Sequence, residues 1–244
     1  MSGEWIDWHA QYDTDATLVR RLEIVRGLLR SELDARPAGS LRAVSLCAGD
    51  GRDLLEVLAT HPRGPDVSGR LVDLEPALVA AGRARIERAR LRGVEFRCED
   101  AGLARAVADA VPADLVLACG IFGNVADDDL RHFVGRLPEL CAPGAFVLWT
   151  RGRFEPDLTP TIRRWFGETG FEELVFVPVP GSTGSVGAHR WRGAARPFDP
   201  NGRLFTFLPE AERPSTRARP ASESPEVRAG PTCTSSGGRA PRRP

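Results

Sequence analysis

Short apolar runs alternate with amphipathic segments along most of the chain, and each pattern predicts a kind of secondary structure. Segment 14–36 repeats leucine and valine at intervals of three and four residues, the spacing of a helix with one buried face. Thr14 or Asp15 can cap its start, and Pro37 and Gly39 end it. We therefore expect a helix ahead of the first strand.

From residue 41 onward, predicted strands and helices alternate regularly. The expected strands are 41–47, 70–74, 94–98, 114–119, 144–149 and 171–179, and the expected helices are 53–60, 76–90, 101–110, 127–140 and 159–169. This alternation indicates a parallel sheet covered by helices on both faces. Right-handed crossovers place the carboxyl ends of all these strands, and the loops that follow them, along one edge.

The last part of the chain has a different pattern. The pieces "GSTGSVGAHRW" and "GRLFTFL" are strand-like with no helix between them, which predicts that the sheet ends in an antiparallel hairpin. From about residue 209 the chain is rich in Pro, Ser, Arg and Gly and cannot bury a core, so we expect disorder there. The predicted organisation is an N-terminal helical segment (1–40), an α/β domain (41–208) and a tail (209–244).

Composition and charge exclude several classes of function. The chain has 244 residues, 42% of them hydrophobic, enough for one sizeable domain with appendages. A formal net charge of +0 provides no general attraction for nucleic acid or an anionic membrane. The N-terminus is polar, and no apolar run is long enough to span a bilayer, so we expect a cytoplasmic protein. The five cysteines lack metal-ligand spacing, so we expect no metal site.

The turn in "VSLCAGDGRDLL" is a candidate ligand loop. Gly49 and Gly51 lie between a predicted strand and a predicted helix, where missing side chains let the backbone approach a ligand closely. Leu54 stands where a dinucleotide-binding turn has its third glycine, and Asp50 and Asp53 would repel a pyrophosphate. The loop therefore disfavours an NAD(P)-dependent oxidoreductase and favours a ligand with a positive charge.

Two further carboxylates follow neighbouring predicted strands. Asp73 ends the second strand about 20 residues past the glycines, where a carboxylate can accept both hydroxyls of a ribose. The alternative is a cap for the helix that begins at Pro76. Asp100 follows the third strand, where it can accept from an adenine amino group or cap the next helix. With the glycine loop, these acids would surround one adenosine.

The order of "VSLCAGDGRDL", "LVDLEP", "FRCEDAG", "DLVLACGIFGNV" and "LPELCAPGAFVLWTRG" resembles the Rossmann-like class I S-adenosylmethionine-dependent methyltransferases over residues 41–208. That family has a doubly wound, seven-stranded sheet, mostly parallel, with an antiparallel strand near its C-terminal end. The chain is also similar to small actinobacterial-type methyltransferases of unassigned substrate, which begin with a segment like "DWHAQYD". The resemblance implies S-adenosylmethionine as cofactor and a small-molecule methyl acceptor.

The resemblance further implies which residues hold the cofactor. The loop backbone would cradle the methionine part and the ribose, the acid of the second strand the ribose hydroxyls, and the acid of the third strand the adenine amino group. In this chain the residues implied are Ala48, Gly49 and Gly51, then Asp73 with Leu74 against the adenine, Asp100 with the Ala101 amide, and the Cys119 carbonyl for the methionine ammonium. The chain departs from the pattern at Ser45, often an acid, and at Cys47, often a glycine. Asp50 or Asp53 is the candidate replacement for the missing charge.

Candidates for contact with the acceptor lie in two places. After the fourth strand, Phe122 and Asn124 would line the pocket beside the methyl group, or Asn124 would serve only the turn. This loop lacks the N/D-P-P-Y/F pattern typical of methyltransferases that act on amino groups of nucleic-acid bases, which favours a small molecule. In the N-terminal segment, Trp8, His9 and Tyr12 form either a lid over the cofactor, with His9 a candidate base, or an aromatic anchor for the first helix.

These features together predict an O- or N-methyltransferase that works by direct in-line displacement, as a monomer or a homodimer. Displacement at a sulfonium methyl needs alignment of the reactants more than it needs a base. Asn124, His9 and Tyr12 are the candidate catalytic residues. A non-catalytic S-adenosylmethionine-binding sensor or partner subunit is the alternative from another class.

Overall fold

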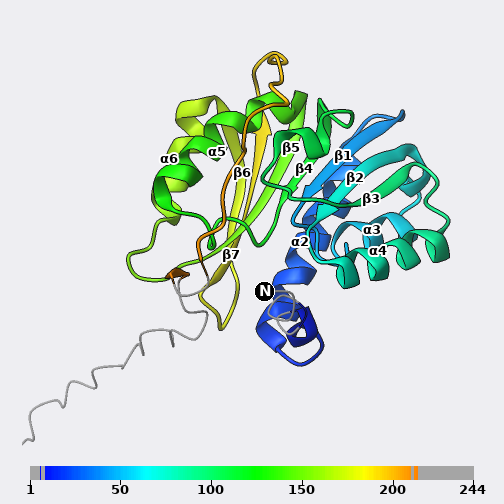
Figure 1. The fold of residues 1–244 in the computed structure, drawn as a ribbon, viewed down its shortest axis with the longest axis horizontal. Coiled ribbons are helices and arrows are strands. Elements are labelled where there is room, and N and C mark those ends of the chain that lie inside the picture. The colour runs from blue at the N-terminus through cyan, green and yellow to red at the C-terminus, as the bar shows by residue number, and fades with distance from the viewer. Residues whose placement is uncertain (1–5, 7–8, 210–211, 214–244) are drawn as a thin grey trace, which may run out of the picture.

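The computed structural model describes residues 6, 9–209 and 212–213 (Figure 1). Its strands are β1 (Leu41–Leu46), β2 (Val67–Asp73), β3 (Val94–Cys98), β4 (Ala113–Ala118), β5 (Cys141–Gly152), β6 (Phe171–Pro178) and β7 (Gly184–Trp191). The α-helices are α2 (Ala16–Ala35), α3 (Leu54–Thr60), α4 (Pro76–Ala89), α5 (Asp127–Leu140) and α6 (Thr159–Thr169). Short 3-10 turns are η1 (Gln11–Asp13), η2 (Gly64–Asp66) and η3 (Ala104–Val107).

The strands form one seven-stranded sheet in the order β3-β2-β1-β4-β5-β7-β6. Strands β1 to β5 pair in parallel, and β7 is antiparallel to both β5 and β6. The predicted α/β class, with its mostly parallel sheet and antiparallel end, is confirmed. The order reverses direction between β1 and β4, and ligands of open α/β sheets bind beyond the carboxyl ends of the strands at such a switch point.

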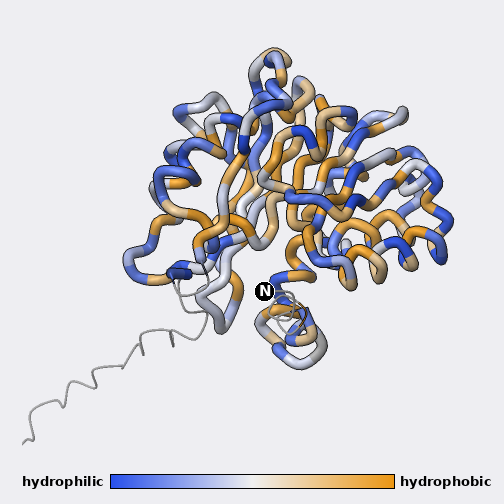
Figure 2. The backbone as a smooth tube through the Cα atoms, viewed as in Figure 1, coloured by the Kyte–Doolittle hydropathy of each residue, from blue (hydrophilic) through white to orange (hydrophobic). Residues whose placement is uncertain are grey.

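Helices cover both faces of the sheet, as the sequence pattern predicts. Helices α2, α3 and α4 pack on one face, and α5 and α6 pack on the other together with residues near the end of the described chain (Figure 1). The central strands carry apolar side chains toward both layers, so hydrophobic residues are concentrated along them (Figure 2). No helix among the described residues is long and apolar enough to cross a membrane.

Helix α2 is attached firmly to the sheet domain. The Asp15 side chain caps it by accepting from the Thr17 amide at 2.7 Å, which selects between the two predicted caps. Leu29 and Leu33 are fully buried against the sheet. Glu32, also buried, pairs with Arg190 of β7. The helical part of the predicted segment 1–40 therefore shares the core of the α/β domain.

Two predicted elements are wrong, and one non-local pairing explains both. The expected helix 101–110 is only the short turn η3, and the expected strand 202–208 forms only isolated bridges. The Ala104 amide donates to the Gly202 carbonyl at 3.1 Å, and the Leu204 amide donates to the Gly102 carbonyl at 2.7 Å. Each segment thus uses backbone groups that its predicted element would have needed. The predicted tail, 209–244, lies almost entirely outside the described residues.

Candidate active site

The loop between β1 and α3 is built on three left-handed residues. Cys47, Gly49 and Gly51 have φ angles of 51°, 60° and 69°. The left-handed conformation is costly for a residue with a side chain, so glycine would suit position 47 better than the cysteine present there. A Cβ atom at Gly51 would lie 2.6 Å from Leu55 and 2.8 Å from Leu71. The missing side chain at Gly51 therefore lets α3 pack closely on the sheet.

The N-terminal segment lies directly on this glycine loop. The imidazole of His9 occupies the space into which a Cβ atom at Gly49 would project. The Tyr12 ring lies 5.8 Å from the His9 ring, its hydroxyl accepts from Arg21, and the Arg52 guanidinium lies 5.0 Å above its face. The structure thus brings two predicted aromatic residues to the switch point, whereas Trp8 lies outside the described residues.

Burial sets the protonation of both residues. Burial lowers the pKa of His9 to about 4, against the opposing effect of the nearby Asp50 carboxylate. Burial also raises the pKa of Tyr12, although Arg21 opposes it. At neutral pH the segment therefore presents an uncharged imidazole and an uncharged phenol. An imidazole with so low a pKa can accept a proton only weakly.

Asp50 and Asp53 are the two acids that could replace a charge at Ser45, and the structure distinguishes them. Ser45 itself is buried in β1, paired with Leu71 of β2 and Leu117 of β4. Asp50 accepts from Arg52 at 2.9 Å and from Arg85 at 3.0 Å, so two arginines already neutralise it. Burial would raise the pKa of Asp50, but these arginines bring it below its usual range.

Asp53 differs from Asp50 in its partners. Its carboxylate accepts from the Leu54 amide at 2.7 Å at the start of α3, and burial raises its pKa. It lies close enough to Tyr12 and Cys119 to raise the pKa of both groups. Asp50 also lies near His9, so the two acids differ in their partners: Asp50 is paired with two arginines, whereas no ion pair joins Asp53 to an arginine among the described residues.

Asp73 links the glycine loop to the start of α4. Its carboxylate accepts from the Gly49 amide at 2.8 Å and from the Glu75 amide at 3.0 Å, and burial raises its pKa. A carboxylate oxygen has a second acceptor site, so these bonds leave capacity for ribose hydroxyls. The next residue, Leu74, is 69% exposed at the same edge.

Asp100 lies beside Asp73 at the same edge. It accepts from the Gly102 amide at 2.8 Å and from Arg203 at 2.9 Å. Burial, reinforced by Asp73 and Asp100, raises the pKa of the Cys47 thiol well above its ordinary value, which places these three side chains together. Sequence reasoning missed Arg203 because no local signal relates it to a strand end about a hundred positions earlier.

The loop after β4 is stabilised by its own polar groups. Gly120 has a φ of 76°, and its amide donates to Thr150 Oγ1 of β5 at 2.9 Å beside Cys119. The Asn124 amide group donates to the Gly120 carbonyl at 2.7 Å. The Asn124 side chain is thus used within the turn, which agrees with the simpler of its two interpretations.

The expectation that the Phe122 ring lines the acceptor pocket does not fit the structure. The ring is fully buried and stacks on Trp149, with 5.1 Å between ring centroids, and on Phe166 at 6.2 Å. The Phe122 ring belongs to the aromatic core on the face of the sheet covered by α5 and α6, where stacking removes its whole apolar surface from water. Only its backbone carbonyl reaches the edge, where it accepts from Arg151.

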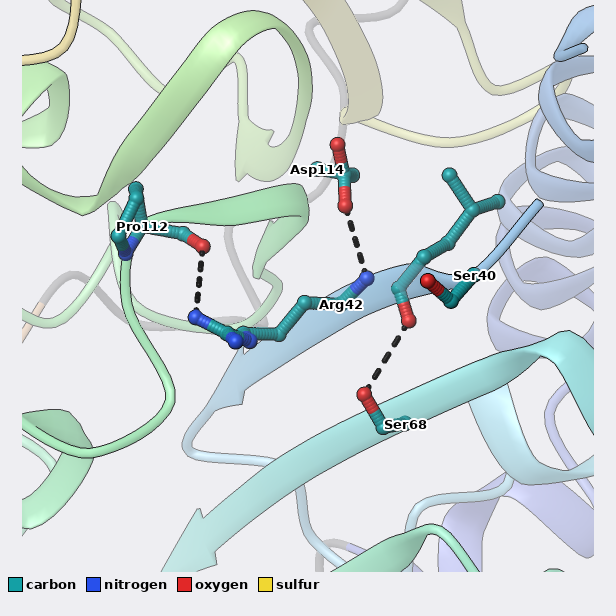
Figure 3. A pocket seen from close by; sticks show the side chains of 6 residues that line it. Ser40, Arg42, Ser68, Pro112 and Asp114 are labelled. Carbon is teal, nitrogen blue, oxygen red and sulfur yellow. Dashed lines mark hydrogen bonds between the residues drawn. The ribbon is translucent and has the colours of Figure 1, made fainter.

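A cavity of about 230 Å³ lies at the opposite edge of the sheet (Figure 3). Its polar groups bond to one another: the Arg42 amide donates to Asp114 at 2.8 Å, and the Ser68 hydroxyl donates to the Leu41 carbonyl at 3.3 Å. It adjoins the starts of β1, β2 and β4 and is therefore separate from the candidate site. Among the described residues, no cluster of His, Cys, Asp or Glu could hold a metal ion.

Strand order, switch-point loop and antiparallel end together define the fold of the class I methyltransferases, and solved structures confirm it. Magnesium protoporphyrin IX methyltransferase from Synechocystis PCC 6803, solved with bound S-adenosylmethionine, matches with a TM-score of 0.61 and 13% identity over 79% of this chain and 93% of that chain. The CurJ carbon methyltransferase matches with a TM-score of 0.62 and 15% identity over 79% of this chain and 59% of that chain.

A third match is the 1,6-didemethyltoxoflavin-N1-methyltransferase of Burkholderia thailandensis, solved with bound 1,6-didemethyltoxoflavin and S-adenosylhomocysteine. Its TM-score is 0.59 and its identity 15%, over 78% of this chain and 85% of that chain. By sequence, neither a protein-family model nor a curated protein matches. The predicted resemblance is therefore confirmed as a shared fold.

Proposed function

We propose that this protein is an S-adenosylmethionine-dependent methyltransferase that acts on a small-molecule acceptor. The observation that carries the proposal is the convergence of Asp53, Asp73 and Asp100 around one left-handed loop at the switch point. These groups suit a cationic adenosine derivative. The matched structures solved with S-adenosylmethionine or S-adenosylhomocysteine support the same ligand.

The residues at the edge fit the adenosine part of this cofactor. Asp73 would accept the ribose hydroxyls with the acceptor sites that its backbone bonds leave open. Leu74, already exposed, would pack on the adenine face. Asp100 and the Ala101 amide would bond the adenine edge, with Arg203 holding Asp100 in place.

The methionine part would lie over the backbone of Ala48, Gly49 and Gly51, with the Cys119 carbonyl and the Asp53 carboxylate accepting from the ammonium group. A buried acid with a raised pKa favours a cationic partner, because pairing offsets the cost of burying its charge. Asp53 would thus supply the charge that Ser45 lacks.

When bound, the cofactor supplies an electrophilic methyl group on a sulfonium. The residues of this chain would align an oxygen or nitrogen nucleophile with that carbon, which removes much of the entropic barrier. We assign His9 and Tyr12 as the lid that excludes water from the switch point, because His9 lies on Gly49 and Tyr12 lies near Cys119. His9 could accept a proton from the acceptor, although its low pKa favours acceptors that lose their proton readily.

The first test is calorimetric titration with S-adenosylmethionine, S-adenosylhomocysteine and NAD. We expect both sulfur ligands to bind more tightly than roughly 1 mM, a binding free energy of about 4 kcal/mol, and NAD not to bind. Failure of both sulfur ligands to bind would overturn the proposal.

Asp53→Asn tests the assignment of the methionine ammonium. We expect affinity for S-adenosylhomocysteine to fall about tenfold, because a charge-assisted bond becomes a neutral one. The control is Asp66→Asn, which changes an acid paired with Arg63 beyond the end of α3. Equal affinities for the two variants would contradict the role of Asp53.

Labelled S-adenosylmethionine, incubated with the protein and a small-molecule extract, separates an enzyme from a sensor. We expect label to appear in an extracted metabolite. Tight binding of the cofactor with no transfer to any fraction would favour the non-catalytic sensor or partner subunit.

A further inference from the structure

Two arginines at the end of β5 have donors that no described group satisfies. Arg151 donates through Nη1 to the Phe122 carbonyl, and Arg153 donates through Nη2 to the Ser182 carbonyl at 3.0 Å. The Nε atom of each is buried and, among the described residues, has no hydrogen-bond partner. A buried guanidinium N–H without an acceptor costs free energy.

The surrounding carboxylates do not compensate for this cost. Burial lowers the pKa of Arg151, while Asp127 and Asp157 oppose that effect from a distance. Within the described part of the chain, neither acid forms an ion pair with Arg151, and no acid pairs with Arg153. Two partly buried cations thus lie two residues apart in sequence, with carbonyl oxygens as their hydrogen-bond acceptors.

Arg151 and Arg153 contact two loops at the edge where an acceptor would lie, the loop after β4 and the β6–β7 turn. The Phe122 carbonyl that Arg151 contacts belongs to the loop after β4, whose Gly120 amide is held by Thr150 of the same strand as Arg151. Arg153 is held at the β6–β7 turn, because its own amide donates to the Thr183 carbonyl at 2.7 Å.

Helix α2 reaches the same edge of the sheet through two arginines. Arg20 of α2 donates to the Pro180 carbonyl of the β6–β7 turn at 3.3 Å, and the next residue, Arg21, donates to Tyr12. Because β5 lies on the other side of β1 and β4 from β2 and β3, Arg151 and Arg153 lie across the switch point from Asp73 and Asp100.

We propose that Arg151 and Arg153 bind an oxyanion of the acceptor, so that the substrate is a small molecule carrying a carboxylate or a phosphate. Guanidinium groups match both anions, since their N–H donors lie in a planar fork. The proposal rests on the proposed function, since it concerns the acceptor side of the same site.

The experiment compares three probes with the same ring: benzoate, phenyl phosphate and the neutral benzamide. Their dissociation constants are measured by ligand-observed NMR, with and without S-adenosylhomocysteine. We expect at least one anion to bind about tenfold more tightly than benzamide, as one charge-assisted hydrogen bond provides. Which anion binds better identifies the carboxylate or the phosphate.

Arg151→Gln and Arg153→Gln should each remove most of the preference for an anion over benzamide. Arg151→Lys should retain more of that preference than Arg151→Gln does. The control is Arg192→Gln, an exposed arginine paired with Glu172 near the other end of the hairpin. Thermal unfolding of each variant checks that it folds. If Arg151→Gln does not fold, Arg153→Gln still tests the proposal.

An equal response to all three probes, including no binding of any, would overturn the proposal, as would a preference that both glutamine variants retain. Binding of S-adenosylhomocysteine is measured in the same samples. Loss of anion preference with the sulfur ligand still bound leaves the proposed function intact, whereas absence of that binding counts against the proposed function itself.

Discussion

The two halves of the sheet present opposite chemistry at the edge where the parallel strands end. On the side of β1, β2 and β3, the loops carry Asp53, Asp73 and Asp100, each accepting a hydrogen bond from a backbone amide. On the side of β5 and β7, the edge carries Arg151 and Arg153, each with a buried donor that lacks an acceptor among the described residues.

This difference suggests a division of labour across the switch point. Acids held by backbone amides are fixed in position, so one half offers preorganised acceptors for hydroxyl and ammonium groups. Under the proposal above, the guanidinium groups of Arg151 and Arg153 would donate to an anion in the other half. His9 and Tyr12 lie over the junction, where both ligands would meet.

The largest expected effect tests whether the loop after β4 is held in place by the aromatic core around Phe122. Phe122→Ala should lower the free energy of unfolding by about 3–5 kcal/mol, because a fully buried ring that stacks on Trp149 is removed. Urea denaturation measures it. Leu174→Ala, at a 40% exposed position on β6, should cost far less. A small loss of stability, together with weaker binding of the anionic probes, would instead support the expectation that the Phe122 ring lines the acceptor pocket.

The second prediction uses pH to probe the same core. His189 is fully buried, accepts from Trp149 Nε1 at 3.2 Å, and burial lowers its pKa from 6.5 to about 4. Below pH 6.5 the unfolded chain takes up this proton first, so stability is complete above pH 6.5 and declines as the pH falls toward 4. The expected loss is about 3 kcal/mol, at roughly 1.4 kcal/mol per unit of pKa difference.

Urea unfolding at a series of pH values measures this loss. His189→Gln should flatten the decline between pH 6.5 and 4, and His132→Gln, on the exposed side of α5, should leave its slope unchanged. His9 has a similarly lowered pKa and contributes in the same direction. A decline that His189→Gln does not alter would show that the histidine is not held neutral.

The third prediction concerns the cofactor half. Asp73→Asn should weaken binding of S-adenosylhomocysteine about tenfold or more, since one charged acceptor oxygen becomes an amide donor. It should also loosen the contact with the Gly49 amide. Calorimetry measures the affinity, with Asp66→Asn as the matched surface control. Unchanged affinity would leave Asp73 as a structural cap for α4.

The smallest expected effects separate a lid from an anchor. Tyr12→Phe should cost about 1 kcal/mol of stability, because Arg21 loses its acceptor on the ring. His9→Ala should speed the dissociation of S-adenosylhomocysteine, measured by stopped flow, since its imidazole covers Gly49. Val19→Ala, on the exposed face of α2, is the control. Lower melting temperatures with unchanged dissociation rates would support the anchor alone.

Much of the fold follows from local pattern. The predicted strand 94–98 and helix 127–140 have the bounds that the structure gives to β3 and α5. In α5 an acidic first turn and a clear apolar face define the helix without outside help. Segments 101–110 and 202–208 lack such signals, and their pairing with each other decided their conformation.

The candidate site divides in the same way. The sequence by itself determined which residue types follow each strand, because the alternation of elements places Asp73, Asp100 and the glycine loop at one edge. It could not distinguish Asp50 from Asp53, since that choice depends on Arg85 reaching Asp50 from α4. Only the tertiary structure placed Phe122 in the core and left the Nε atoms of Arg151 and Arg153 without an acceptor among the described residues. A strand's position follows from its periodicity, whereas a side chain's partners come from segments far away in the chain.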